Sequence, residues 1–152
     1  MKKIASFTVN HDTLEKGMYI SRIDGDVVTY DIRMKKPNGG DYLNMSAAHT
    51  LEHLFATYAR NSALSEHVIY VGPMGCRTGF YFLVRDKMTH AQAIGLVKES
   101  MAFARDFVGE IPGNKKEECG NYLDHDLPSA KRSAADMASV LRSWTPDKMK
   151  YE

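Results

Sequence analysis

The chain has 152 residues, of which 43% are hydrophobic and 26% charged, with a formal net charge of +1. This composition predicts one domain over residues 1–152 and gives no electrostatic reason to expect nucleic acid or an anionic membrane as a partner. Because we find no apolar stretch long enough for a secretory signal or a membrane span, we expect a cytoplasmic protein.

The first half of the chain predicts three strands and one helix. Phe7, Val9 and His11 alternate with polar residues, which suggests a short strand. Residues 18–23 and 27–33 predict two further strands joined by a tight turn at 24–26. After a glycine-containing loop at 37–40, apolar residues recur at helical spacing from Ser46 to about Arg60. We therefore expect a helix over that last segment.

The second half predicts two strands and two helices. Residues 68–71 and 78–84 are expected to be strands on either side of a turn at 72–75. Thr89 and Gln92 form a capping box that opens a helix to about residue 108. After an irregular stretch at 111–126, Ser129 is expected to cap a last helix through Trp144. Because strands and helices do not alternate strictly, we expect an α+β fold with an antiparallel sheet and about three helices.

The most informative motif is the run His49-Thr50-Leu51-Glu52-His53, which lies inside the first predicted helix. Two histidines four residues apart lie on one helix face, where neutral imidazoles can share a metal ion. Glu52 lies beside them and is placed to take a proton from a group that the metal activates. This H-x-x-E-H order is the one found in inverted zinc hydrolases, so the sequence predicts a metal site.

A catalytic metal usually has three protein ligands and one open position, so a third ligand is needed. The candidates are Cys119, Cys76, His11, His125, Glu117 and Glu118. Cys119 is favoured, because it lies in a predicted loop beside Gly120, where the backbone can bend to present the sulfur. Cys76 follows a glycine turn and precedes a strand, which suits an exposed reactive group. We expect His125 to be structural, with a role in orienting a ligand as the less favoured alternative.

Several motifs together resemble the S-ribosylhomocysteine lyase (LuxS) family. They occur in the same order over almost the whole chain, and any one of them alone would be weak. The pieces are Ser6-Phe7 followed by His11, Tyr30-Asp31-Ile32-Arg33, the His49–His53 run, the stretch from Pro73 to Tyr81 containing Pro-Met-Gly-Cys, Glu118-Cys119-Gly120-Asn121-Tyr122, and His125-Asp126-Leu127.

The resemblance implies a role for each matching residue. His49, His53 and Cys119 match the family's metal ligands, and the metal is typically Fe²⁺, with Zn²⁺ or Co²⁺ able to replace it, one per subunit. Glu52 and Cys76 match the two acid/base residues. Residues lining the substrate pocket are matched by Ser6, His11 and Arg33, with Arg60 as a further candidate. The family is homodimeric, with two active sites near the subunit interface.

The resemblance also implies a reaction, the cleavage of S-ribosylhomocysteine to homocysteine and 4,5-dihydroxy-2,3-pentanedione, the autoinducer-2 precursor. Breaking the thioether requires a leaving group β to a carbonyl, so the carbonyl of the sugar must first migrate along the chain. Each migration removes a proton from one carbon and delivers one to its neighbour. Glu52 and Cys76 are side chains of the right type for these transfers. A cation beside Cys76 would favour its thiolate, and Arg33 and Arg77 are both candidates.

One stretch departs from the family pattern. Many members carry Asp-x-Ser-Pro-Met-Gly-Cys, whereas this chain has Tyr70-Val71-Gly72 before Pro73. An aspartate there would suit the amino group of the homocysteine half of the substrate, but Tyr70 offers only a hydroxyl. We therefore expect that amino group to be held differently in this protein.

Two other functions fit the metal motif alone. A small metallopeptidase or other hydrolase would fit the H-x-x-E-H order, although such enzymes are usually far larger. A non-enzymatic metal-binding or signalling domain would instead have a closed fourth position on the metal, and the substitution Glu52→Gln would then have no activity to remove.

Overall fold

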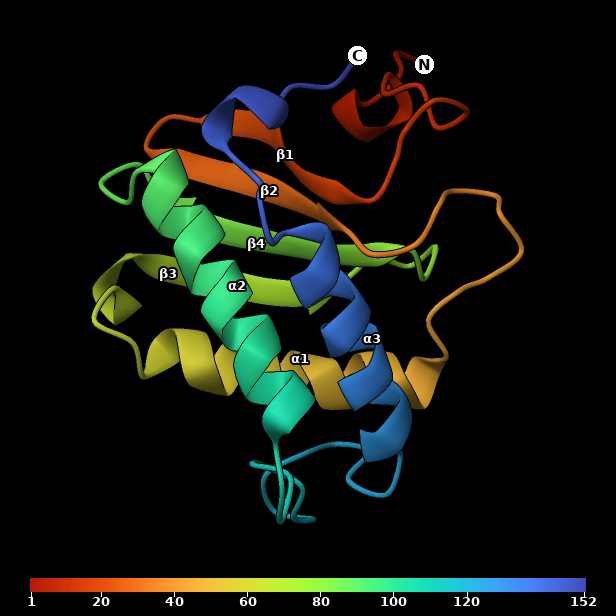
Figure 1. The fold of residues 1–152 in the computed structure, drawn as a ribbon, viewed down its shortest axis with the longest axis vertical. Coiled ribbons are helices and arrows are strands. Elements are labelled where there is room, and N and C mark those ends of the chain that lie inside the picture. Colours follow the sequence, from red (N-terminus) through yellow and green to blue (C-terminus); the bar gives the residue numbers. More distant parts are fainter.

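The computed structural model describes residues 1–152 and contains one four-stranded sheet and three α-helices. The strands are β1 (Gly17–Asp24), β2 (Val27–Arg33), β3 (Val68–Pro73) and β4 (Gly79–Arg85), in the order β1-β2-β4-β3, and all neighbours are antiparallel. The helices are α1 (Met45–Arg60), α2 (His90–Asp106) and α3 (Leu127–Val140). In Figure 1, α2 and α3 lie in front of the sheet, and α1 runs below β3. The predicted α+β class is confirmed.

The hydrophobic core lies between the sheet and the helices, where 29 buried residues form one cluster. Phe80 and Phe82 of β4 are fully buried, and the ring of Phe55 on α1 lies 6.3 and 5.3 Å from them. Leu51 and Leu54 are buried beside Phe55. Because these apolar residues hold one face of α1 against the core, the opposite face carries His49, Glu52 and His53 half-buried at the surface.

The predicted strand at residues 7–11 is wrong. The segment instead contains a short 3₁₀ helix, Ala5–Phe7, followed by turns. The Thr8 hydroxyl donates to the Ala5 carbonyl at 2.6 Å, and the Asn10 side chain accepts the Asp12 N–H at 3.0 Å. Such local side-chain-to-backbone bonds favour turns over strands. The alternating pattern buries nothing here, since Phe7 is 68% exposed.

The last helix differs from the prediction at both ends. It begins at Leu127 with Asp126 as its N-cap, and the Asp126 carboxylate accepts the backbone N–H of Ser129 at 3.0 Å. Ser129 is therefore inside the first turn and does not cap the helix. The helix ends at Val140, and the residues up to Trp144 form a turn. Pro128 fits this start, because proline is well tolerated in the first helical turn.

The Asp126 cap has a testable consequence for stability. Hydrogen bonds from Ser129 hold the pKa of Asp126 below its usual value of 3.8. Its stabilising effect is therefore present above pH 3.8 and is lost as the pH falls through the lower pKa of the folded state. We expect Asp126→Ala to lower the free energy of unfolding by about 1 kcal/mol at pH 7 and by less near pH 3. Urea unfolding of the metal-free protein at both pH values measures this.

The matched control is Asp126→Asn, which keeps a side-chain oxygen for the Ser129 N–H. It should retain most of the stability at pH 7, because asparagine is an equally good N-cap. If Asp126→Ala lowered the free energy of unfolding by the same amount at pH 7 and pH 3, the titration argument would be contradicted.

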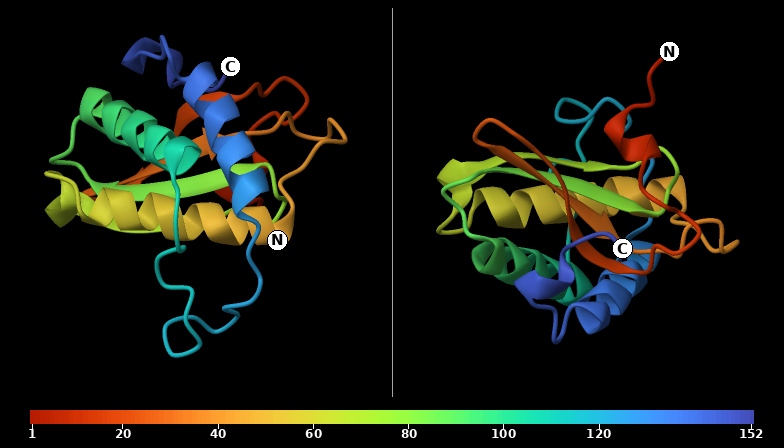
Figure 2. Two further views of the ribbon diagram at one scale, coloured as in Figure 1. Left: turned by 60° about the horizontal axis from the view of Figure 1, so that its bottom comes forward. Right: turned by 90° about the horizontal axis from the view of Figure 1, so that it is seen from above.

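The N-terminal and C-terminal segments complete the fold around β1. The 3₁₀ helix near the N-terminus lies on the side of the sheet opposite α2 and α3 (Figure 2). The Trp144 ring packs against Gly17, where a Cβ atom would come within 2.3 Å of the ring, and its Nε1 donates to the Met18 carbonyl at 2.9 Å. The Met149 carbonyl accepts the Ile20 N–H at 2.8 Å. These contacts hold the end of the chain along the edge of the sheet.

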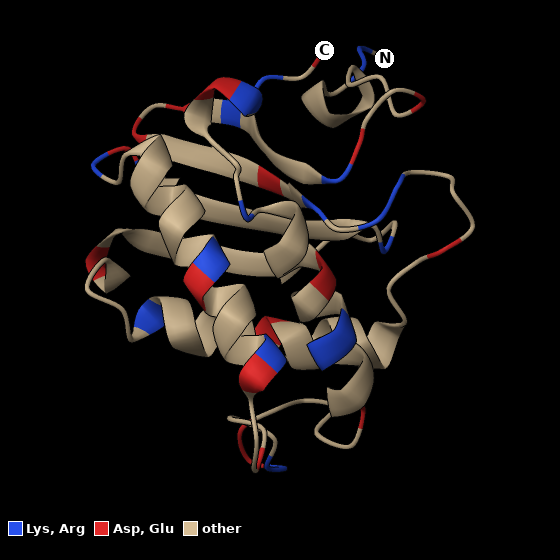
Figure 3. Ribbon diagram, viewed as in Figure 1, with Lys and Arg blue, Asp and Glu red and all other residues tan.

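The surface carries both signs of charge. Figure 3 shows acidic and basic residues interspersed over the helices and loops in this view. No helix combines the length and the apolar composition needed to cross a membrane.

Candidate metal centre and active site

Four side chains with metal-binding atoms meet where the middle of α1 lies against the long loop between α2 and α3. They are His49, His53, Cys119 and His125, and one ligand atom from each lies within 4.8 Å of the others. The Nε2 atoms of His49 and His53 are 3.1 Å apart, and Cys119 Sγ lies 3.4 Å from His49 Nε2. The structure thus brings together the three residues that the sequence analysis selects as ligands.

The backbone orients both α1 histidines toward a shared point. His49 Nδ1 lies 2.7 Å from the Asp124 carbonyl, and His53 Nδ1 lies 2.7 Å from the Pro112 carbonyl. A carbonyl oxygen only accepts, so each Nδ1 carries the proton and each Nε2 presents a lone pair. Two lone pairs 3.1 Å apart cannot hydrogen-bond to each other. A cation between them resolves this arrangement, as in metal sites where the second ring nitrogen binds a carbonyl.

The distances also fit a metal. An ion held tetrahedrally at about 2.0–2.1 Å from nitrogen and about 2.3 Å from sulfur separates two nitrogens by about 3.3 Å and nitrogen from sulfur by about 3.5 Å. The corresponding separations here are 3.1 and 3.4 Å. The Asn121 N–H also donates to Cys119 Sγ at 3.4 Å and so helps to fix the position of the sulfur. The donor set therefore fits a divalent ion that accepts two imidazoles and one thiolate.

His125 is closer to this centre than its expected structural role suggests. Its ring stacks on that of His49 at 4.2 Å with an interplanar angle of 15°, and its Nδ1 lies 2.8 Å from the buried Thr50 hydroxyl. Burial, together with His49 and His53, lowers the pKa of His125. Its Nε2 is buried without a hydrogen-bond partner. A neutral His125 therefore supports the His49 ring and keeps one free nitrogen at the centre.

A cavity of about 480 Å³ opens beside His49. Glu52 lines it from α1, Pro73 to Gly75 and Arg77 line it from the turn between β3 and β4, and Asn121 and Asp124 line it from the long loop. Cys76 lies between two of the lining residues and is exposed. The cavity thus has His49 and Glu52 on one wall and the turn that carries Cys76 on another.

The turn that carries Cys76 is tightly held. The Arg77 N–H donates to the Met74 carbonyl at 3.0 Å, and the Arg77 carbonyl accepts the Leu43 N–H at 2.9 Å. Arg77 has φ of 62°, a left-handed conformation that is uncommon for a residue with a side chain. These hydrogen bonds fix the backbone on both sides of Cys76, which the turn carries as an exposed residue.

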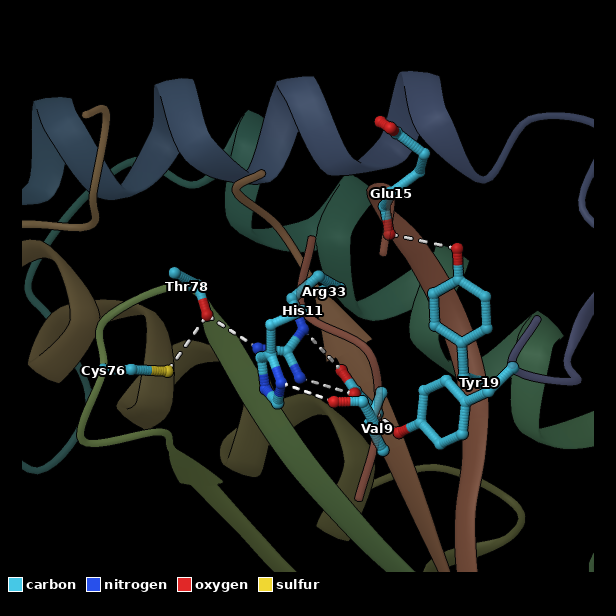
Figure 4. A network of polar contacts seen from close by, with 9 residues as sticks. Val9, His11, Glu15, Tyr19, Arg33, Cys76 and Thr78 are labelled. Atoms are coloured by element: carbon cyan, nitrogen blue, oxygen red, sulfur yellow. Dashed lines mark hydrogen bonds and ion pairs between the residues drawn. The ribbon is translucent and has the colours of Figure 1, made fainter. Parts of the chain in front are cut away.

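Of the two candidate cations, Arg33 is the one joined to Cys76 by hydrogen bonds. Cys76 Sγ lies 3.0 Å from Thr78 Oγ1, and Arg33 Nη1 donates to the same oxygen at 2.8 Å (Figure 4). The Arg77 guanidinium lies over the Tyr42 ring at 5.8 Å. Burial alone would lower the pKa of Arg33. The hydrogen bonds to Asp31 and the charge of Asp31 have a larger combined effect, so the pKa of Arg33 is raised. Sequence reasoning gave Thr78 no role of its own, although the residue lies in the motif from Pro73 to Tyr81.

The other predicted substrate-pocket residues lie away from the metal cluster. Ser6 lines a separate cavity of about 290 Å³ with Tyr70 and Tyr81. His11 is half-buried, and its Nδ1 lies 2.8 Å from the Val9 carbonyl. Arg60 ends α1 and donates to the carbonyls of Val68 and Ile69 at 3.5 and 2.8 Å. Within one chain, the structure therefore brings none of these three residues to the cavity beside His49.

Comparison with known proteins agrees with this geometry. The sequence profile of the S-ribosylhomocysteinase (LuxS) family matches residues 4–148. The chain is 46% identical to the S-ribosylhomocysteine lyase of Clostridium acetobutylicum, over 99% of each protein. It is 46% identical to that of Phocaeicola vulgatus, over 99% of this chain and 98% of the relative, and 40% identical to that of Borrelia garinii, over 99% of each. The chain belongs to the S-ribosylhomocysteinase (LuxS) family.

Proposed function

We propose that this protein is a metal-dependent carbon–sulfur lyase that cleaves S-ribosylhomocysteine to homocysteine and 4,5-dihydroxy-2,3-pentanedione, the autoinducer-2 precursor. The observation that carries the proposal is a cavity lined by Glu52 and His49 on one side and by the turn of Cys76 on the other, next to the cluster of His49, His53, Cys119 and His125, in a chain of this family. The reaction needs carbonyl migration along the sugar followed by β-elimination of homocysteine. It therefore needs two proton-transfer groups and a means of stabilising negative charge on oxygen.

The metal is proposed to be Fe²⁺, one per subunit, with Zn²⁺ or Co²⁺ as functional replacements. His49, His53 and Cys119 would hold it, and all three ions accept imidazole and thiolate ligands. When bound, such an ion supplies Lewis acidity that stabilises charge developing on substrate oxygens, typically by several kcal/mol. The proposed ligand set leaves one tetrahedral position for water or substrate, as catalytic sites require.

Glu52 and Cys76 are proposed to move the protons. Glu52 lies on the same wall of the cavity as His49, so its carboxylate can take a proton from a carbon of a sugar chain bound there. Cys76 must be a thiolate to act as the second base. The Thr78 hydroxyl accepts from Arg33 and so has its own proton free to donate to the sulfur.

Ser6, His11 and Arg33 are proposed to bind the substrate, with Arg60 as a weaker candidate. Arg33 donates to Thr78, whose hydroxyl lies beside Cys76 Sγ, and this supports a place for Arg33 next to the proposed acid/base thiol. Ser6 and His11 come from the N-terminal segment on the far side of the sheet. Arg60 uses its guanidinium on backbone carbonyls of β3, which leaves it less free for substrate.

We also propose a cytoplasmic homodimer with its active sites near the interface. Ile4, Phe7 and Tyr70 are 56%, 68% and 52% exposed, and Ile4 and Tyr70 line the same cavity on the sheet side away from α2 and α3. An apolar group of this kind suits contact with a second copy. Two free cysteines, one of them in the cluster that could hold a metal ion, suit a reducing compartment.

Tyr70 provides a test of how the amino-acid half of the substrate is held. Its hydroxyl lies 2.1 Å from where a Cβ atom of Gly72 would be, so the tyrosine fills the space left by that glycine. We expect Tyr70→Asp to lower KM about fivefold with little change in kcat, because a carboxylate there attracts the substrate ammonium without touching the reacting carbons. Steady-state kinetics measures KM and kcat separately. Tyr70→Phe controls for loss of the hydroxyl alone, and an unchanged KM in Tyr70→Asp would exclude this position from substrate binding.

The proposed function is tested by two assays run side by side. Protein purified without oxygen is incubated with S-ribosylhomocysteine and, separately, with a mixture of peptides, while a thiol reagent and an amine reagent follow the products. The lyase predicts thiol release and no new amines. Peptide cleavage without thiol release would instead establish the hydrolase alternative, and neither activity in metal-loaded protein would favour a metal-binding domain.

A further inference from the structure

The strongest unassigned feature is a chain of buried polar contacts that joins the C-terminal segment to Cys76. Tyr151 donates its hydroxyl to Asp31 Oδ2 at 2.7 Å. Asp31 accepts from Arg33 Nε and Nη2 at 3.1 and 2.6 Å, and Arg33 Nη1 donates to Thr78 beside Cys76. Figure 4 shows Thr78 and Arg33 between Cys76 and Tyr19. Asp31, Arg33 and Thr78 are 1%, 3% and 3% exposed.

We propose that Tyr151 is a positioning residue, which fixes the Asp31–Arg33 pair so that Arg33 holds Thr78 and Cys76 in their reactive arrangement. The proposal rests on the assignment of Cys76 as a reactive thiol in the proposed function. It adds a residue from the last two positions of the chain, which no active-site motif includes.

The fold delivers Tyr151 to Asp31 through β1. Tyr19 lies directly opposite Asp31 in the pairing of β1 with β2, and the Tyr151 ring stacks on Tyr19 at 5.3 Å and 21°. Met149, two residues earlier, is fully buried and bound to the backbone of β1. The stacked rings therefore place the Tyr151 hydroxyl over the neighbouring strand. Burial and the charge of Asp31 raise the pKa of Tyr151, so the hydroxyl stays protonated and donates.

The geometry of the guanidinium explains why this contact matters. Asp31 binds the Nε and Nη2 edge of Arg33, which fixes the plane of the group and leaves Nη1 for Thr78. Tyr151 binds the same Asp31 oxygen as Nη2, so it limits how the carboxylate can rotate. If the carboxylate turns, the guanidinium turns with it, and Nη1 leaves Thr78. Gly79 lies opposite Arg33 on β4, so no neighbouring side chain there would hold the guanidinium in place.

The experiment measures the reactivity of Cys76 directly. Zinc-loaded wild-type and Tyr151→Phe proteins are alkylated with iodoacetamide between pH 6 and pH 9, and the modified peptides of Cys76 and Cys119 are quantified separately. Besides Arg33 and Asp31, the titratable groups around Cys76 are Tyr81 of β4, Arg77 of the turn and Glu52 across the cavity. Tyr151→Phe leaves all of them in place, so a change reports the lost hydroxyl.

We expect Tyr151→Phe to slow alkylation of Cys76 at pH 7 about three- to tenfold and to move its pH profile to higher pH, since one hydrogen bond to a charged group is lost. Modification of Cys119 should be unchanged, and kcat should fall by a similar factor with KM nearly constant. The matched control is Tyr19→Phe, which removes a hydroxyl from the ring that stacks on Tyr151. That hydroxyl donates to the Glu15 carbonyl and not to Asp31. It should react like wild type.

Two results would overturn the proposal. An unchanged alkylation rate and pH profile in Tyr151→Phe would show that the hydroxyl does not reach Cys76. Equal slowing in Tyr151→Phe and Tyr19→Phe would show that only packing of the C-terminal segment matters. Because alkylation requires no substrate, either result is distinct from a failure of the lyase assignment, which thiol release measures separately.

Discussion

Replacing Glu52 by glutamine should abolish most turnover while leaving the metal in place. The amide keeps the size of the side chain but cannot take up a proton, so kcat should fall about 10²- to 10⁴-fold. Metal content should remain at one ion per chain, because His49, His53 and Cys119 are untouched. Glu52 lines the cavity next to His49 and lies half-buried on the face of α1 that points away from the core, so the substitution should not disturb the core.

The measurement pairs thiol release from S-ribosylhomocysteine with metal analysis of the same samples. Glu66→Gln is the matched control, since Glu66 is exposed in the short helix Ser65–His67 after α1 and is absent from the cavity. Wild-type turnover in Glu52→Gln would remove Glu52 from the proton-transfer scheme. Loss of the metal in that variant would show instead that the carboxylate holds the metal centre together.

Replacing Cys119 by alanine should remove the metal itself. The loss of an outer hydrogen-bond partner already costs about 10–100-fold in metal affinity, so the loss of a ligand should cost more than about 100-fold. His53→Ala should behave in the same way, because its Nε2 faces that of His49 at 3.1 Å. Metal affinity is measured by competition with a chromophoric chelator.

The second cysteine is the matched control for this prediction. Cys76→Ala should keep the wild-type affinity for metal and lose turnover, because Cys76 lies in the β3–β4 turn outside the metal cluster. Wild-type affinity in Cys119→Ala would contradict the proposed ligand set. It would make His125, whose buried Nε2 has no other partner, the third ligand.

The features that could be predicted from the sequence are those set by short spacings along the chain. In the site, the four-residue interval between His49 and His53 fixes one helix face. In the fold, the Thr89–Gln92 capping box at the start of α2 is present as expected. Asp31 and Arg33 are two residues apart on a strand, which places them on one side of the sheet and allows them to pair. Their pairing was accessible from spacing alone, although sequence reasoning did not use it.

The contacts that sequence reasoning could not reach depend on how distant segments pack. The approach of His125 to His49 depends on the path of the loop between α2 and α3, where backbone carbonyls of Pro112 and Asp124 orient the histidines. The contact between Tyr151 and Asp31 spans 120 residues and needs the C-terminal segment to run along β1. No local pattern encodes either arrangement. The wrong prediction of a strand at residues 7–11 has the opposite cause. The alternating pattern is present there, but the segment packs against no other element that would bury its apolar side chains, and Phe7 is exposed.

The central claim is that the metal bound by His49, His53 and Cys119 is required for cleavage of the thioether. The most direct measurement adds Fe²⁺ or Co²⁺ in steps to metal-free protein under anaerobic conditions and follows homocysteine release from S-ribosylhomocysteine. We predict that the rate rises in proportion to bound metal and levels off at one ion per chain. Full activity in the metal-free protein, or no thiol release at one bound ion per chain, would contradict the claim.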